Sequence, residues 1–79
     1  MYKEDTSYKV LKMISDYIKL NLMAPSIIEV SEACDFKHHS TAAHYINKLF
    51  MHGMISKTPN RSRSIKITAK GMRALGAAK

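Results

Sequence analysis

The sequence predicts a single, mainly α-helical domain with one small β-hairpin near its end. Apolar residues recur at helical spacing through most of the first 53 residues, and the spacing changes to two after Ile55. A chain of 79 residues has room for one compact core. The hydrophobic content of 46% is typical of a globular protein and argues against intrinsic disorder.

The first predicted helix runs from about Thr6 to Leu22. Its apolar residues recur every three or four positions and form one broad face: Val10, Leu11, Met13, Ile14, Tyr17, Ile18 and Leu22. Asp5 or Thr6 suits the N-terminal cap, and residues 1–5 are expected to fray. The helical pattern breaks before Pro25, because a residue that precedes proline is disfavoured in helical geometry.

A second, shorter helix is predicted over residues 27–34. Ser26 and Glu29 have the S-x-x-E spacing of a capping box, in which the hydroxyl and the carboxylate bind free backbone N–H groups. Asp35 suits the short turn that follows, because aspartate tolerates left-handed backbone geometry. The Phe36 side chain is expected to point from this turn into the core. The residues expected to be buried are Ile27, Val30 and Cys34.

The third predicted helix begins near His39 and ends at Gly53, a good C-terminal cap. One face is apolar and consists of Ala42, Tyr45, Ile46, Leu49 and Phe50. The opposite face is rich in hydrogen-bond donors and has no acid: Ser40, Thr41, His44, Asn47 and Lys48. Such a face fits the major groove of DNA, although an ordinary amphipathic surface helix shows the same pattern.

Strands are expected over residues 55–58 and 64–68, joined by a turn rich in polar residues. Thr68 suits the cap of a final short helix, whose end at residues 76–79 is expected to fray. A first helix, two helices joined by a short turn and then a hairpin describe a winged helix-turn-helix domain.

Charge is distributed unevenly along this chain of net charge +7. The first 35 residues hold all six acidic residues and four basic ones, whereas residues 36–79 hold nine basic residues and no acid. A basic half is typical of a nucleic-acid-binding protein, and double-stranded DNA is the expected partner. An acidic protein or an anionic membrane would attract the same charge. A membrane is not expected, because no basic segment has a strong apolar face of its own.

Few residues suit catalysis or cofactor binding, and neither an enzymatic activity nor a cofactor is expected. Because the chain has a single cysteine, Cys34, it cannot form an internal disulfide, and a reducing cytoplasmic setting is expected. With DNA as the partner, association with the nucleoid is also expected. No metal site is expected, because the histidines lack a convergent third ligand. Every acid precedes residue 36, and none is placed behind a histidine as a Ser-His-Asp arrangement requires.

Several short segments, in register, match a known family. They are Met23–Pro25, Glu29–Val30, Phe36–Lys37, Ala42–Ala43, Lys48–Leu49, Gly53–Ile55 and Ser62–Ile65. Over roughly residues 8–67 the sequence therefore resembles the N-terminal DNA-binding domain of the LexA repressor family. The resemblance implies that the early part of the third helix reads base edges, through His38, Ser40, Thr41, Ala43 and His44.

The chain also departs from this family. Where the family carries an asparagine and a pair of glutamates in the third helix, this chain has Ser40, Ala43 and His44. The target sequence is therefore expected to differ from an SOS operator. The resemblance does not extend to the family's self-cleaving, dimerising C-terminal domain, so autoproteolysis and SOS control are not expected. A small regulator of a phage, plasmid or other mobile element is the closer analogy.

The predicted contacts with DNA fall into two groups. The predicted base contacts are His38, Ser40, Thr41, Ala43, His44 and Asn47. The predicted contacts of the backbone or the wing are Lys37, His39, Lys48, Lys57, Arg61, Arg63 and Lys66. Lysine acts mainly as a point charge on phosphate, whereas arginine also suits a narrow minor groove. Solvated histidines and merely solubilising arginines at the hairpin tip remain open alternatives.

The leading hypothesis is a sequence-specific transcription regulator from a bacterium or phage. One module buries too little surface for tight selective binding, so a homodimer on adjacent half-sites is expected. The first alternative is an adaptor whose winged helix binds a protein partner, such as a polymerase subunit or a host regulator. The second alternative is an excisionase-like architectural protein that bends DNA.

Overall fold

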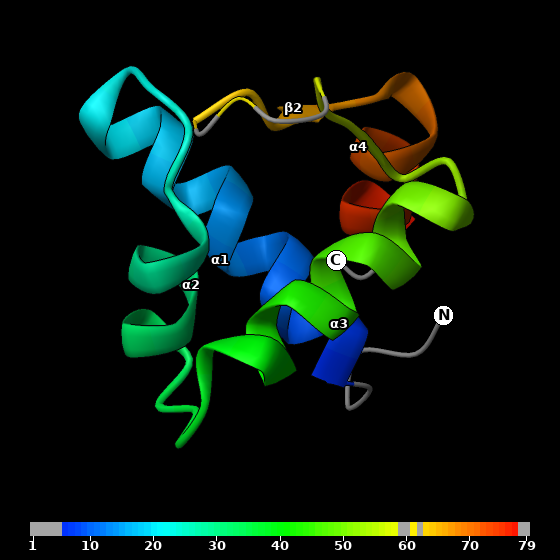
Figure 1. Cartoon of the computed structure of the whole chain (residues 1–79). Coiled ribbons are helices and arrows are strands. Elements are labelled where there is room, and N and C mark those ends of the chain that lie inside the picture. Colours follow the sequence, from blue (N-terminus) through cyan, green and yellow to red (C-terminus); the bar gives the residue numbers. More distant parts are fainter. Residues whose placement is uncertain (1–5, 59–60, 62, 78–79) are drawn as a thin grey trace.

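The computed structural model describes residues 6–58, 61 and 63–77, and it has the predicted arrangement of helices followed by a hairpin (Figure 1). The elements are α1 (Thr6–Asn21), α2 (Ile27–Ala33), α3 (His39–Met51), β1 (Ile55–Ser56), β2 (Lys66–Ile67) and α4 (Ala69–Ala77). The mainly α-helical fold class with one small hairpin is therefore confirmed.

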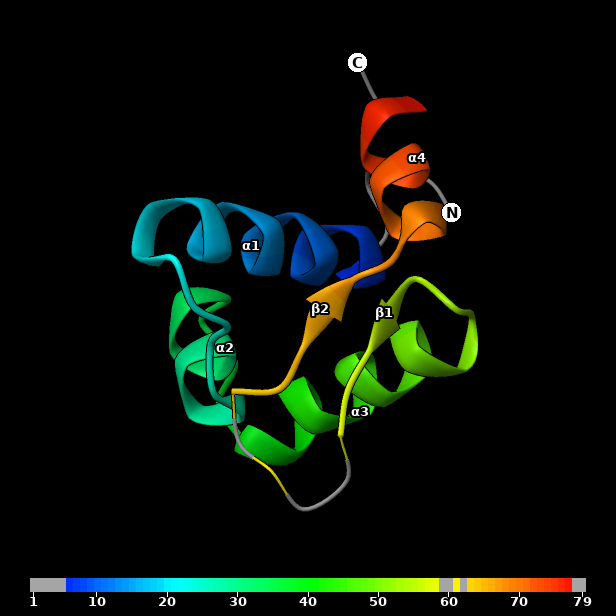
Figure 2. The ribbon, with the colours of Figure 1, turned by 90° about the horizontal axis from the view of Figure 1, so that it is seen from above.

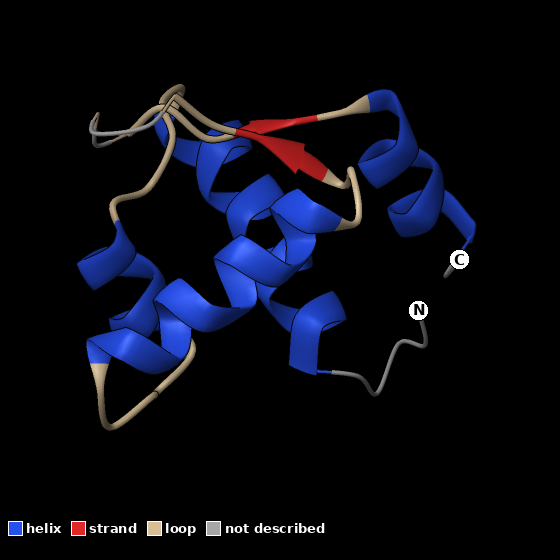
Figure 3. Cartoon of the chain, turned by 45° about the vertical axis from the view of Figure 1, so that its right-hand side comes forward, coloured by secondary structure: helices blue, strands red, loops and turns tan. Residues whose placement is uncertain are grey.

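The core lies where α1 and α2 pack against α3 and the hairpin closes over them. In Figure 2 the hairpin lies across the layer formed by α1 and α3, and Figure 3 shows the two short strands along one side of the helices. The buried apolar side chains come from every element except α4 and β2: Val10, Leu11, Ile14, Ala24, Val30, Ala42, Ile46, Leu49, Ile55 and Ile65.

The capping box predicted at the start of α2 is present. The backbone N–H of Glu29 donates to the Ser26 hydroxyl (3.2 Å), and the backbone N–H of Ser26 donates to the Glu29 carboxylate (2.8 Å). After α2, Asp35 has a φ of +59°, the left-handed conformation expected of it. The backbone N–H of Phe36 then donates to the Ser31 carbonyl (2.9 Å), and the Phe36 ring packs against the core. A backbone hydrogen bond to α2 and the packing of the Phe36 ring on the core thus hold the short turn between α2 and α3.

The end of α3 sets the direction of the hairpin. Gly53 has a φ of +76°, and its N–H donates to the Phe50 carbonyl (3.0 Å), while the N–H of Met54 donates to the Leu49 carbonyl (3.0 Å). These two hydrogen bonds form a Schellman motif, which explains why glycine suits this position. The chain leaves α3 directly into β1.

The two strands are antiparallel and shorter than the sequence predicts. Ile55 pairs with Ile67 and Ser56 pairs with Lys66. Beyond the strands a side chain holds the turn, because the N–H of Thr58 donates to the Ser64 hydroxyl (3.0 Å). That hydroxyl lies 2.9 Å from the Arg61 carbonyl, to which it donates its proton. Hydrogen bonds of the Ser64 side chain therefore take the place of the outer backbone hydrogen bonds expected between the two strands.

Helix α4 packs closely on the hairpin. The Thr68 hydroxyl accepts a hydrogen bond from the N–H of Gly71 (3.1 Å), so the predicted cap is confirmed. It also donates to the Gly53 carbonyl (2.6 Å), which ties α4 to the end of α3. A Cβ at Gly71 would overlap the Met54 carbonyl oxygen, so only glycine allows this approach.

Four predictions of burial were wrong. Leu22, expected on the apolar face of the first helix, follows the end of α1 with a φ of +59° and is 89% exposed. Ile27 is 43% exposed, because it borders a cavity between α2 and the hairpin turn instead of the core. Phe50 is 40% exposed and lies beneath the Lys57 ammonium, 5.5 Å from the ring centroid. Cys34 is only partly buried. Residues 76 and 77 form the last turn of α4, and their fraying stays a prediction. Residues 1–5 and 78–79, also expected to fray, lie outside the described residues.

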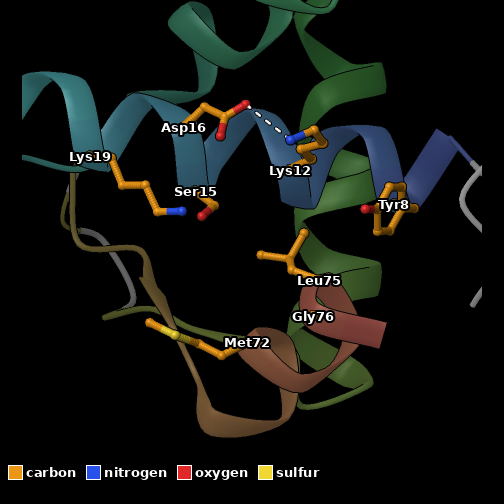
Figure 4. Close-up of a pocket in the computed structure, with 8 residues that line it drawn as sticks. All are labelled: Tyr8, Lys12, Ser15, Asp16, Lys19, Met72, Leu75 and Gly76. Carbon is orange, nitrogen blue, oxygen red and sulfur yellow. Dashed lines mark ion pairs between the residues drawn. The ribbon is translucent and has the colours of Figure 1, made fainter. Parts of the chain in front are cut away.

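A groove with a volume of about 440 Å³ lies between α1 and α4 (Figure 4). Within it, the Lys12 ammonium lies 3.6 Å from the Asp16 carboxylate, and both side chains are more than half exposed. The lining comes from these two helices alone: Tyr8, Lys12, Ser15, Asp16, Lys19, Met72, Leu75 and Gly76. The groove is therefore separate from the outward face of α3. None of the described helices is both long and apolar enough to span a bilayer.

Candidate nucleic-acid interface

Helix α3 presents to solvent the face that the sequence analysis identified. His39, Ser40, His44, Asn47 and Lys48 are exposed, and Thr41 and Ala43 are half-buried beside them. The opposite side of the same helix holds the fully buried Ala42, Ile46 and Leu49. The donor-rich side chains therefore share one accessible surface, as groove recognition requires.

Aromatic contacts hold the first half of α3 in place. The ring of Tyr45 stacks on Phe36 with centroids 5.8 Å apart and an interplanar angle of 22°. The His44 ring meets Tyr45 edge-on, with centroids 5.2 Å apart. This packing joins the inter-helix turn to α3 and restrains the direction in which His44 leaves the helix. A recognition side chain supported in this way loses less conformational freedom when it binds.

The N-terminus of α3 is open to an anion. His38 occupies the N-cap position with extended backbone angles, and its side chain makes no capping hydrogen bond. No acid lies in the first turn, and the neighbouring Lys37 is exposed. The positive end of the helix dipole and its free N–H groups favour a phosphate at this position. The residues next to this position in the sequence, Lys37, His38 and His39, are all exposed.

The hairpin extends this basic surface. Arg61 and Lys66 are exposed, and Lys57 is half-buried where it lies over Phe50. The Lys57–Phe50 contact joins the start of the hairpin turn to the end of α3. All the acids among the described residues lie on α1, on α2 or in the turn after it: Asp16, Glu29, Glu32 and Asp35. A surface formed by α3 and the hairpin is thus almost entirely positive.

Arg63 differs from the other predicted wing contacts because it binds within the protein. Its Nη1 lies 2.7 Å from Glu29 Oε1 and donates to the Ala24 carbonyl (3.2 Å), and its Nη2 donates to Glu29 Oε2 (2.9 Å). The Arg63 hydrogen bonds, together with that from the Ser26 backbone, lower the pKa of Glu29 from 4.5 to about 2. The same contact raises the pKa of Arg63. A DNA contact by Arg63 stays a prediction, and the ion pair is a feature that the sequence analysis missed.

The residues that could bind a metal or act as a nucleophile do not form such a site among the described residues. Among the described residues, no three His, Cys, Asp or Glu side chains gather as a metal site would need. Burial raises the pKa of the Cys34 thiol, although the charge of Lys9 acts in the opposite direction. The thiol therefore stays protonated near neutral pH, which makes it a poor nucleophile.

Comparison with known proteins identifies the family. The sequence model described as the LexA DNA binding domain matches residues 5–64. The LexA repressor of Oenococcus oeni is 42% identical over 52 residues, which are 66% of this chain and 24% of that protein. The LexA repressor of Moorella thermoacetica is 40% identical over 58 residues, or 73% of this chain and 28% of that protein. The LexA repressor of Lactiplantibacillus plantarum is 33% identical over 73 residues, or 92% of this chain and 35% of that protein. The chain thus spans about a third or less of the length of these relatives, and it belongs to the family of LexA DNA-binding domains.

Proposed function

We propose that this chain binds double-stranded DNA in a sequence-specific manner and regulates transcription, with α3 in the major groove. The observation that carries this proposal is the outward face of α3, which is rich in donors, free of acids and rigidly backed by the core. Membership of the LexA DNA-binding domain family and relatives that are LexA repressors support the same function.

Base reading is assigned to the outward face of α3, from its N-cap to Asn47. Asn47 has the paired donor and acceptor that recognise adenine, and the hydroxyls of Ser40 and Thr41 can donate to or accept from either kind of base. The Ala43 methyl group offers an apolar contact for the methyl group of thymine. His38, at the N-cap, and the exposed His44 add ring N–H donors to this surface.

Affinity is assigned mainly to the basic side chains around α3. Lys37 precedes α3, and His39 and Lys48 lie in its first and last turns, whereas Lys57, Arg61 and Lys66 belong to the hairpin. We assign all six to the DNA backbone, where lysine and arginine release condensed counterions when they neutralise phosphates. Such contacts orient the protein without reading sequence.

We further propose that two copies bind adjacent half-sites. A single module of this size buries about 600–1,000 Å² on DNA, which is at the low end for a specific complex. Pairing doubles the contacts, and the symmetry of a dimer predicts an inverted repeat in the target. Footprinting of a selected duplex would show two protected half-sites, whereas protection of one short segment would contradict pairing.

The orientation of the domain on DNA can be tested by NMR titration with a short duplex. The largest changes in amide shift are expected at Ser40, His44 and Lys66. Tyr8 and Met72, in the groove between α1 and α4, serve as internal controls and should change little. Largest changes at that groove would contradict the proposed orientation.

A further inference from the structure

The hairpin is joined to the start of α2 by one guanidinium group. Both terminal nitrogens of Arg63 bind the Glu29 carboxylate, at 2.7 and 2.9 Å, and Nη1 also donates to the Ala24 carbonyl (3.2 Å). Glu29 Oε1 additionally accepts from the Ser26 backbone (2.8 Å). A forked, charge-assisted contact of this kind is stronger and more directional than a single hydrogen bond. Figure 2 shows the chain that leads into β2 passing beside α2.

The backbone at Arg63 indicates that this contact holds the turn in a defined shape. Arg63 has a φ of +57°, a left-handed conformation that is uncommon for a residue with a side chain. Such a conformation persists where surrounding contacts stabilise it. The next residue, Ser64, binds the opposite arm of the hairpin at Thr58 (3.0 Å). Arg63 therefore holds the hairpin turn to α2, and Ser64 holds it to Thr58, which follows β1.

The same contact makes Arg63 a poor ligand for phosphate. Its charge is balanced by a carboxylate whose pKa is lowered to about 2, so the partner stays ionised at any physiological pH. A phosphate would have to displace that carboxylate from both nitrogens. Arg61, two residues earlier, is exposed and has no acid among its described hydrogen-bond or ion-pair partners. The two arginines of the hairpin thus have different environments.

From this geometry we infer that Arg63 and Glu29 are positioning residues for DNA binding. The pair fixes the hairpin turn against α2, so that Arg61, Lys57 and Lys66 meet the DNA backbone at a set distance from α3. Arg63 acts through Glu29 and not by touching DNA. The inference rests on the proposed function, because it concerns how the same interface is arranged.

The decisive variant is Glu29→Gln, because the two explanations predict changes of opposite sign. Glutamine at this position retains the capping box but removes the charge that holds Arg63. If Arg63 contacts phosphate, removing a nearby negative charge strengthens DNA binding. If the pair positions the hairpin, Glu29→Gln weakens binding about threefold to tenfold, the loss expected when a side chain and turn must be ordered on binding.

Double-mutant analysis gives a second discriminating result. Arg63→Gln should weaken binding by the same factor as Glu29→Gln, and the double variant should be no weaker than either single variant. The matched control is Asp16→Asn, which removes a negative charge from an exposed pair with Lys12 on α1. It should not weaken binding. Tighter binding by Glu29→Gln, or fully additive losses, would overturn the inference.

Hydrogen exchange in the free protein separates this inference from the proposed function. The Thr58 amide, which donates to Ser64 across the turn, should exchange at least several-fold faster in Glu29→Gln and Arg63→Gln than in the parent. The Met54 amide, at the end of α3, should exchange at an unchanged rate and shows that the fold is intact. Unchanged exchange at Thr58 would overturn the inference. Absence of DNA binding by the parent protein would contradict the proposed function alone.

Discussion

The assignment of Arg61 to the DNA backbone predicts a defined change in the salt dependence of binding. Five formally charged cations around α3 and the hairpin have no carboxylate partner among the described residues: Lys37, Lys48, Lys57, Arg61 and Lys66. If each neutralises one phosphate, the slope of log Kobs against log salt concentration is about −4.5, since each contributes about −0.9. Arg61→Gln should reduce this slope to about −3.6.

These slopes correspond to a measurable difference in affinity. Between about 50 and 200 mM salt, the parent protein should lose about 500-fold in affinity and Arg61→Gln only about 150-fold. Fluorescence anisotropy with a labelled duplex of mixed sequence measures both curves. Lys12→Gln is the matched control, because Lys12 lies on α1 beside Asp16 and outside the interface. An unchanged slope for Arg61→Gln, or an equal reduction for Lys12→Gln, would refute the placement of the hairpin on the backbone.

Three further predictions concern the structure that supports the interface. Ile46→Ala removes a fully buried side chain from the inner face of α3 and should lower the free energy of unfolding by about 2–5 kcal/mol in urea titrations. A loss below about 1 kcal/mol would contradict its place in the core. Gly71→Ala should lower the midpoint of thermal unfolding, because the added Cβ overlaps the Met54 carbonyl oxygen, while Gly76→Ala, which meets open space, is the control. The Arg63 hydrogen bonds lower the pKa of Glu29 to about 2 in the folded protein, against an ordinary value of 4.5. The carboxylate therefore stabilises the fold above about pH 4.5, and this contribution is lost as the pH falls toward 2. The stability difference between the parent and Glu29→Gln should therefore shrink over that interval, and a difference independent of pH would contradict the ion pair.

The elements that the sequence predicted well are those stabilised by short-range hydrogen bonds. Ser26 and Glu29 are three residues apart, as are Thr68 and Gly71, so both caps are visible as local patterns. The glycine that ends α3 is visible for the same reason. Such contacts join residues that are close in the sequence, so their formation depends little on the packing of distant elements.

The features that the sequence did not reveal depend on distant contacts. Arg63 and Glu29 are 34 residues apart, and their pairing depends on how the hairpin turns back toward α2. Helical periodicity placed Phe50 on the apolar face, but its side chain is 40% exposed, and the Lys57 ammonium lies over its ring. Periodicity identifies which side chains share a face, but it does not specify how far the neighbouring element extends.

If α3 reads base sequence, selection of bound duplexes from a random pool should reveal the bases that it prefers. The parent protein and His44→Ala would be compared at about 150 mM salt, which suppresses nonspecific binding. We predict that the parent enriches a defined motif and that His44→Ala changes the preferred bases at one or two positions of it. Identical motifs for both proteins would contradict base reading by His44. No enrichment by the parent would contradict sequence-specific binding and favour the protein-binding adaptor.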